Sequence, residues 1–208
     1  MGINLGVLKN SGGLGLRVNF NIDPIVDYNN RHSLVKNNVL VSDPVVENGY
    51  ANFVGNNHYY TTSGSNITDF RFGTGDFEIT TEIRLNSNAP TILVVWDLIR
   101  NLSFDDTERM GLYIANGTLQ ARVYGVGGNE LINAGLIPIS TTNFTKISVK
   151  RLSGVLGLYV DNVLIDSIAN NTDFDETVEV RFGGTAAALA GDTQFIGQMK
   201  SFTIKKLS

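Results

Sequence analysis

Apolar and polar residues alternate with a period of two in several parts of the chain, which is the pattern of β-strands. In residues 77–85, one set of alternate positions is Phe77, Ile79, Thr81, Ile83 and Leu85. Such alternation places one side of a strand in a core and the other in water. Residues 146–150 and 178–182 repeat the pattern, so Glu179 and Arg181 are expected to face water. No stretch of ten or more residues has a convincing helical stripe, and an all-β fold is predicted.

Two hairpins can be registered from the sequence, and the first turns at Asn116 and Gly117. Asn116 and Gly117 both tolerate the positive φ angles of a type I′ turn, which joins two antiparallel strands in two residues. The predicted cross-strand pairs are Ile114 with Leu119, Leu112 with Ala121, and Met110 with Val123. All six residues are apolar and fall on one face, so the turn and the pattern agree.

Asp161 and Asn162 predict a second hairpin. The expected pairs are Val160 with Val163, Leu158 with Ile165, and, on the opposite face, Tyr159 with Leu164. Because the second face is also partly apolar, we expect another layer or a partner to cover it. Tyr159 and Leu164 are therefore candidates for a protein contact.

The last apolar residues of the chain change phase. Phe195, Gly197 and Met199 share one phase, whereas Phe202 and Ile204 share the other. A β-bulge near residues 200–201 would bring both sets to the same face, because it adds one residue to one strand.

Composition sets limits on function. The 208 residues carry a net charge of −4 and no cysteine, which excludes disulfides and thiolate chemistry and fits a reducing compartment. The mild acidity argues against nucleic-acid binding. No stretch approaches the roughly 20 apolar residues of a membrane span, and Met1–Phe20 lacks the pattern of a signal peptide. Residues 1–13 are predicted to form an N-terminal arm or edge segment, and residues 14–208 one domain.

Five segments, in order, resemble the concanavalin A-like lectin/glucanase superfamily, specifically laminin-G-like domains of bacterial surface and bacteriophage structural proteins. They are Gly15–Val35, Ala51–Tyr60, Phe70–Asn86, Phe144–Ser167 and Val178–Ile204. The chain departs from the family where Phe144 replaces a tryptophan and Asn162 a glycine. The resemblance implies an antiparallel two-sheet jelly-roll β-sandwich with one concave sheet. Function in this superfamily ranges from sugar binding to hydrolysis to architecture, so it does not follow from the fold.

An enzyme is not expected. Glycoside hydrolysis needs two carboxylates flanking one bond, and the family's Glu-x-Asp-x-x-Glu strand is missing. Asp105, Asp106 and Glu108 come closest and are interpreted as a solvated loop. With only His32 and His58 and no Gly-x-Ser-x-Gly elbow, a nucleophilic triad is also disfavoured.

Aromatic residues with polar neighbours are the candidates for ligand binding, since a flat ring and a polar tip suit a sugar. The set is His58, Tyr59, Trp96, Asp97, Tyr124, Asn129 and Glu130. For Trp96 the alternative is a core anchor, for His58 and Tyr59 a strand edge, and for Asp97 an ordinary surface residue.

No cofactor is required by the sequence. A structural calcium ion is the one metal to consider, because the family often places one near loops of this kind. The candidate ligands are Asp23, Asp27, Asn29 and Asp76. The alternative for each is that it caps a turn.

Three classes of function remain. The first is a non-enzymatic virion structural protein, such as a capsid decoration, fibre or tail component. It would be assembled in the host cytoplasm, form a homo-oligomer, and bind other virion proteins and cell-surface glycans. The alternative is a carbohydrate-binding module or lectin, and a glycan hydrolase ranks last because the carboxylate pair is missing.

Overall fold

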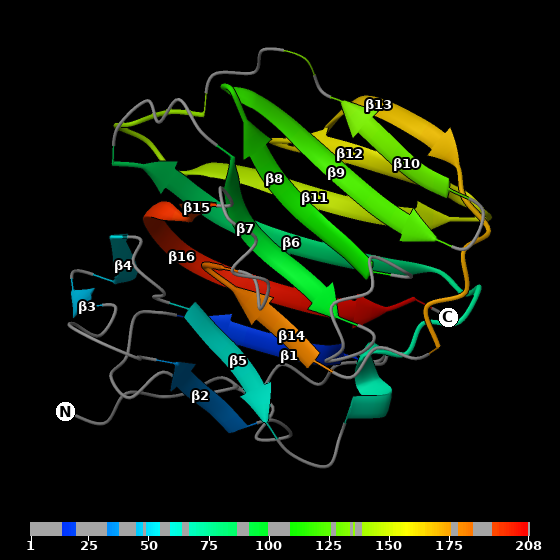
Figure 1. The fold of residues 1–208 in the computed structure, drawn as a ribbon, viewed down its shortest axis with the longest axis horizontal. Coiled ribbons are helices and arrows are strands. Elements are labelled where there is room, and N and C mark those ends of the chain that lie inside the picture. The colour runs from blue at the N-terminus through cyan, green and yellow to red at the C-terminus, as the bar shows by residue number, and fades with distance from the viewer. Residues whose placement is uncertain are drawn as a thin grey trace, which may run out of the picture.

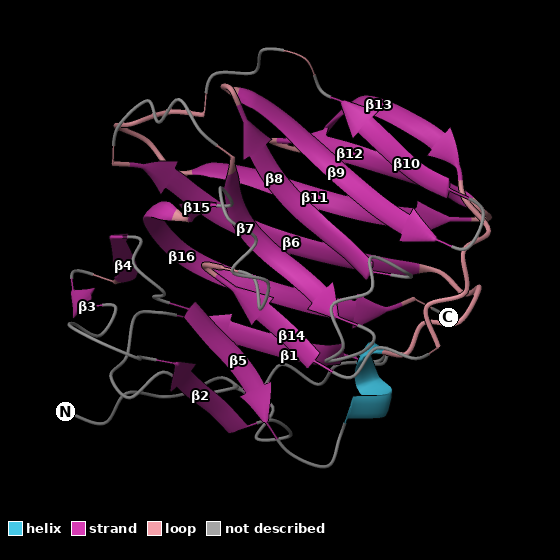
Figure 2. Ribbon diagram, viewed as in Figure 1, coloured by secondary structure: helices cyan, strands magenta, loops and turns pink. Residues whose placement is uncertain are grey.

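The computed structural model describes residues 14–19, 33–37, 45–47, 49–54, 59–63, 67–86, 92–99, 109–125, 128–133, 135, 139–175, 179–184 and 193–207. Within these ranges the chain is almost entirely strand, with one short 3-10 helix at Ile67–Phe70 (Figure 2). No helix in the described ranges is long and apolar enough to cross a membrane. The predicted arm, residues 1–13, lies outside the described residues.

The strands form two eight-stranded sheets that lie face to face (Figure 1). Sheet A has the order β13 (Val163–Ala169), β12 (Val155–Val160), β11 (Thr145–Leu152), β6 (Phe77–Leu85), β16 (Ile196–Lys206), β4 (Tyr50–Val54) and β3 (Val45–Glu47), and β1 (Leu14–Asn19) also pairs with β16.

Sheet B lies in front of sheet A in Figure 1. Its order is β10 (Gly128–Asn133), β9 (Thr118–Gly125), β8 (Arg109–Ala115), β7 (Leu93–Ile99), β14 (Glu179–Phe182), β5 (Tyr59–Ser63) and β2 (Ser33–Asn37). The short strand β15 (Thr193–Gln194) pairs with β7 in parallel, whereas the other pairings in both sheets are antiparallel. The predicted antiparallel two-sheet β-sandwich is confirmed.

The core lies between the sheets and is built from the alternate apolar positions of both. The strand β6 buries every second residue, as its sequence predicts. Across the core, Trp96 of β7 meets the ring of Phe202 of β16 edge-on, with centroids 6.3 Å apart. Phe182 of β14 stacks on the same Phe202 ring at 5.2 Å. These contacts join sheet B to the centre of sheet A, because aromatic pairs add stabilisation to the area that they bury.

The Asn116–Gly117 hairpin has the predicted register. Their φ angles are 51° and 76°, as a type I′ turn requires. The observed pairs are Ile114 with Leu119, Leu112 with Ala121, and Met110 with Val123.

The second hairpin follows the prediction for only two pairs. Val160 pairs with Val163 and Tyr159 with Leu164, but Leu158 pairs with Asp166 instead of Ile165. A register shift between Leu158 and Tyr159 makes Ile165 an extra residue of β13. The predicted pairing of Leu158 with Ile165 is therefore wrong. The turn fixes register only up to the first bulge.

The predicted bulge in the last strand is confirmed. The register of β16 against β6 shifts between Met199 and Ser201, which leaves Lys200 as the inserted residue. Met199 and Phe202 are both buried as a result. The hydroxyl of Thr81 donates to the carbonyl of Ser201 at 3.0 Å, so a buried polar residue of β6 satisfies the backbone next to the bulge.

Arg151 of β11 is fully buried and fastens two loops to the end of sheet A. Its guanidinium donates to the carbonyls of Gly73, Gly75 and Thr172, with the Nε to Gly75 oxygen distance at 2.8 Å. Its carbon lies 5.0 Å from the ring centre of Phe77. Burial lowers the pKa of Arg151, and the carboxylates of Asp76 and Asp173 oppose that shift. The residue is a structural clamp that the sequence pattern did not reveal.

We predict that replacing Arg151 with Lys lowers the free energy of unfolding by about 3 kcal/mol, because a compact ammonium cannot span the separate carbonyls. Urea denaturation measures the change. Lys205→Met removes a partly exposed cation from the same sheet and is expected to cost less than about 0.5 kcal/mol. Equal losses in the two variants would contradict a stabilising role of the Arg151 clamp.

Two glycines allow the stability cost of backbone strain to be distinguished from the cost of a steric clash. Gly117 (φ 76°) and Gly183 (φ 88°) both adopt the left-handed region. A Cβ at Gly117 meets nothing, whereas one at Gly183 overlaps the ring of Phe53. We predict that Gly117→Ala costs about 1 kcal/mol and Gly183→Ala about 2 kcal/mol more. Chemical denaturation of the pair tests this, and a smaller loss at residue 183 would contradict the packing.

Candidate functional site

A row of polar residues crosses the face of sheet B that points away from the core. Its members are directly opposite one another on five adjacent strands: Thr61, Arg181, Asp97, Gly111 and Arg122. On β14, β7, β8 and β9 the residues on either side of each member are apolar and buried in the core, so the alternation of these strands places the row on the other side. We call this side the polar face of sheet B.

The centre of the polar face holds Asp97 beneath a tyrosine. Asp97 is fully buried, and the hydroxyl of Tyr113 donates to its Oδ1 at 3.5 Å. A Cβ at Gly111 would lie 2.6 Å from Cε2 of Tyr113 and 2.9 Å from Oδ1 of Asp97. Glycine is therefore needed at position 111 so that the ring can lie across β8. The interpretation of Asp97 as a surface residue is wrong, because its charged group is enclosed by the sheet and its neighbours.

Arg122 of β9 is held in one orientation beside this centre. Its Nε and Nη2 donate to Oε1 of Gln120 at 2.9 and 2.6 Å, and its Nη1 lies 3.4 Å from the hydroxyl of Tyr124. The guanidinium carbon also lies 4.9 Å from the ring centre of Tyr113. Gln120, Arg122 and Tyr124 are half-buried, so one side of this row is accessible. An Arg fork fixed by neutral partners beside a tyrosine suits hydrogen bonding to a polar ligand.

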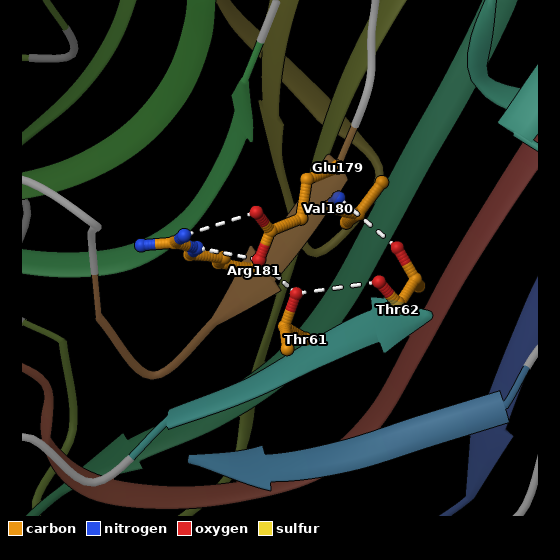
Figure 3. A network of polar contacts seen from close by, with 5 residues as sticks. All are labelled: Thr61, Thr62, Glu179, Val180 and Arg181. Carbon is orange, nitrogen blue, oxygen red and sulfur yellow. Dashed lines mark hydrogen bonds and ion pairs between the residues drawn. The ribbon is translucent and has the colours of Figure 1, made fainter. Parts of the chain in front are cut away.

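The other flank of the polar face is an ion pair, shown in Figure 3. Nε of Arg181 lies 2.7 Å from Oε1 of Glu179, and Nη2 lies 2.9 Å from Oε2. The hydroxyl of Thr61 donates to the same carboxylate, and the hydroxyl of Thr62 accepts from the amide of Val180 at 3.1 Å. Arg181 is buried, so the expectation that both charges face water is wrong for this residue. Mutual neutralisation with hydrogen bonding is what permits charges to leave water.

This geometry is better suited to binding than to acid-base catalysis. Among the described side chains, two carboxylates of this face are Asp97, which accepts from Tyr113, and Glu179, which is bound on both oxygens by Arg181. A glycan hydrolase needs one of two carboxyl groups to carry a proton that it can donate. Both oxygens of Glu179 are occupied by the Arg181 guanidinium, so neither is free to contact a glycosidic oxygen. Asp105, Asp106 and Glu108 lie outside the described residues.

The predicted ligand residues do not lie together on one surface of the structure. Trp96 is buried in the core, so its interpretation as a surface platform is wrong and the core-anchor alternative is confirmed. Tyr124 lies on the polar face. For Tyr59, Asn129 and Glu130 only the backbone is described, and the register puts Asn129 opposite Tyr124 and Glu130 opposite Val123. His58 lies outside the described residues.

Sequence reasoning missed Tyr113, Gln120, Arg122 and Arg181. The signal for Gln120 and Arg122 was present, because polar residues of β9 alternate with Leu119, Ala121 and Val123. Nothing in the local sequence could place Arg181 beside Asp97, since these residues are 84 positions apart and meet only through the pairing of β14 with β7.

The calcium candidates are only partly described. Asp23, Asp27 and Asn29 lie outside the described residues. The Oδ1 of Asp76 accepts from the amide of Ser153 at 2.8 Å, as a capping residue does. The nearby carbonyls of Gly73 and Gly75 are engaged by Arg151. Among the residues with a described position, no three His, Cys, Asp or Glu side chains gather in a way that could hold a metal ion.

A second candidate surface lies at the edge of sheet A, where β13 is the terminal strand. Val163, Leu164 and Ile165 are consecutive, and their exposed fractions are 62%, 50% and 37%. Next to them the ring of Tyr159 is half-buried, with Nζ of Lys150 lying 4.9 Å from its centre. Exposed apolar residues that gather on a strand edge are typical of a protein contact.

Comparison with known proteins supports the fold. No family model and no curated protein matches the chain. Solved structures that share its fold include the binding domain of Paraclostridial Mosquitocidal Protein 1, with a TM-score of 0.68 and 19% identity. Botulinum neurotoxin type C has a TM-score of 0.67 and 14% identity, and the binding domain of botulinum neurotoxin DC with rat synaptotagmin II has 0.65 and 13%. Each match covers 94% of this chain but 49% of the other, so the chain spans about half the length of these proteins. The chain thus has the β-sandwich fold found in these toxin domains.

Proposed function

We propose that this chain is a non-enzymatic binding domain that recognises its ligand through the polar face of sheet B. The observation that carries this proposal is the half-buried row of Gln120, Arg122 and Tyr124, in which a guanidinium is fixed by neutral partners. The carboxylates beside this row are engaged by Tyr113 and Arg181, which leaves the face suited to hydrogen bonding and unsuited to proton transfer.

The proteins that share the fold support a binding role. Botulinum neurotoxin type C is described as interacting with two ganglioside molecules, and the binding domain of the DC type occurs in complexes with SialylT and with rat synaptotagmin II. By analogy of fold, glycans and proteins are the two ligand classes to test first, while the proposal itself rests on the residues of the polar face.

For the biological role of this binding domain, we propose a virion structural protein, such as a capsid decoration, fibre or tail component, assembled in the host cytoplasm. It is supported by the resemblance to laminin-G-like domains of phage structural proteins and by the apolar edge of β13. Through this edge the domain would contact a neighbouring virion protein or a second copy of itself. The alternative is a separate carbohydrate-binding module, for which the polar face alone would suffice.

For the polar face, we predict that Arg122→Ala and Tyr124→Ala each weaken glycan binding about 10-fold, because each removes hydrogen-bonding groups worth about 1.4 kcal/mol. A glycan array at high protein concentration identifies the ligand, and titration of that ligand measures the loss. Lys205→Ala, on the other sheet, is the control and is expected to bind normally. Unchanged binding in both polar-face variants would contradict this site.

For the apolar edge, we predict that Leu164→Asp lowers the molecular mass measured by light scattering from that of an oligomer to that of a monomer. A buried charge at a contact is costly, whereas the same residue on the isolated domain is in water. Ser167→Asp on the same strand is the control and is expected to leave the mass unchanged. A wild-type monomer, or an oligomer insensitive to both changes, would contradict a self-contact at β13.

A further inference from the structure

The outer face of sheet A carries an arginine with an unusual set of neighbours. Arg84 of β6 packs against two aromatic rings, with its guanidinium carbon 5.0 Å from the centre of Tyr50 and 4.9 Å from that of Phe144. The two ring centres are 5.8 Å apart, so the three groups touch one another. Cation–π contacts of this kind hold the guanidinium in place without neutralising its charge.

The hydrogen bonds of Arg84 go only to neutral acceptors. Its Nε donates to Oε1 of Gln198, and its Nη1 donates to the carbonyl of Thr142 at 3.1 Å. No carboxylate in the described part of the chain lies within ion-pair distance of Arg84, in contrast to Arg181 with its Glu179. A guanidinium has five N–H groups. The Nη2 amino group and one N–H of Nη1 therefore have no acceptor among the described residues.

Two amide side chains, those of Asn52 and Asn86, lie on the same face of sheet A as Arg84. Gln198 is directly opposite both Arg84 and Asn52. Asn86 follows Arg84 by two residues, directly after the end of β6. Nδ2 of Asn86 donates to Oδ1 of Asn52 at 3.0 Å, which leaves the carbonyl oxygen of Asn86 and the amino group of Asn52 for other partners. A second cation, Lys200, is 5.9 Å from the ring centre of Phe144, but it is paired with Glu82 at 3.1 Å. The cluster thus holds one uncompensated, pre-oriented fork beside two amides.

We infer that Arg84 is the anchor of a second binding site, which takes a carboxylate-bearing sugar. A carboxylate matches the planar fork in a bidentate arrangement, and the amides of Asn52 and Asn86 can bond sugar hydroxyls as donors and acceptors. A single unpaired cation favours an acidic sugar over a polyacidic peptide, which gains its affinity from several free cations. The site is on the opposite sheet from Arg122, and the inference deepens the proposed glycan binding.

The test compares two guanidinium variants on an array of sialylated and uronic-acid glycans, together with the same glycans in desialylated or carboxyl-reduced form. We expect the wild type to prefer the acidic forms and Arg84→Gln to lose that preference at least 10-fold. Lys205→Gln removes a cation from sheet A and is the control, which is expected to keep the preference. Arg122→Gln reports separately on the polar face of sheet B. Arg84→Lys keeps the charge and removes the fork, so it is expected to retain only part of the binding.

The outcomes distinguish this inference from the proposed function. Binding of neutral glycans without a preference for acidic forms would overturn the Arg84 site and leave the polar face intact. If Arg122→Gln abolished the preference for acidic glycans and Arg84→Gln kept it, the acidic sugar would bind sheet B, and the Arg84 site would be overturned. Equal competition by a poly-glutamate peptide would overturn the sugar as ligand. Thermal unfolding of each variant checks that a loss of glycan binding is measured on folded protein. If Arg84→Gln is unfolded, Arg84→Lys takes its place in the comparison.

Discussion

The packing of Phe202 against Trp96 and Phe182, which are neighbours on sheet B, joins the two sheets. Phe202 can occupy this place only because Lys200 is inserted as a bulge, which returns the end of β16 to the core side. Without the extra residue, Phe202 and Ile204 would face outward. One backbone irregularity thus decides whether the last strand contributes apolar area to the sandwich, and the hydrophobic effect favours the bulged register.

Each sheet of the sandwich has one outer face, and charged side chains have different kinds of partner on the two outer faces. On sheet B, Asp97 and Arg181 are buried and each has a polar partner, as burial requires. On sheet A, Glu78 lies among lysines. Burial raises the pKa of Glu78, but the hydrogen bond and charge of Lys150, together with the charges of Lys205 and Lys146, outweigh burial, so the pKa lies below its ordinary value. Arg84 differs from Glu78 and Arg181, because its partners in the described part of the chain are two aromatic rings and two neutral acceptors.

These differences distinguish three surfaces of the sandwich. The polar face of sheet B offers hydrogen bonds from a fixed row, the β13 edge offers apolar side chains, and the Arg84 cluster offers a positive charge. A binding domain uses a few well-placed groups and a rigid support, and both sheets supply that support. Because the surfaces lie on different strands, a change at one is expected to leave the others unaltered.

Local patterns in the sequence determined the fold class, the register of the Asn116–Gly117 hairpin and the bulge at Lys200, because period-two alternation and turn chemistry act between near neighbours. The same reasoning failed for Leu158, whose pairing with Asp166 depends on a second bulge. Only the tertiary structure decided that Asp97 is enclosed and that Arg84 meets Tyr50. Those neighbours come from other strands, and the pairing of β-strands brings them together without a signal in the sequence around each residue.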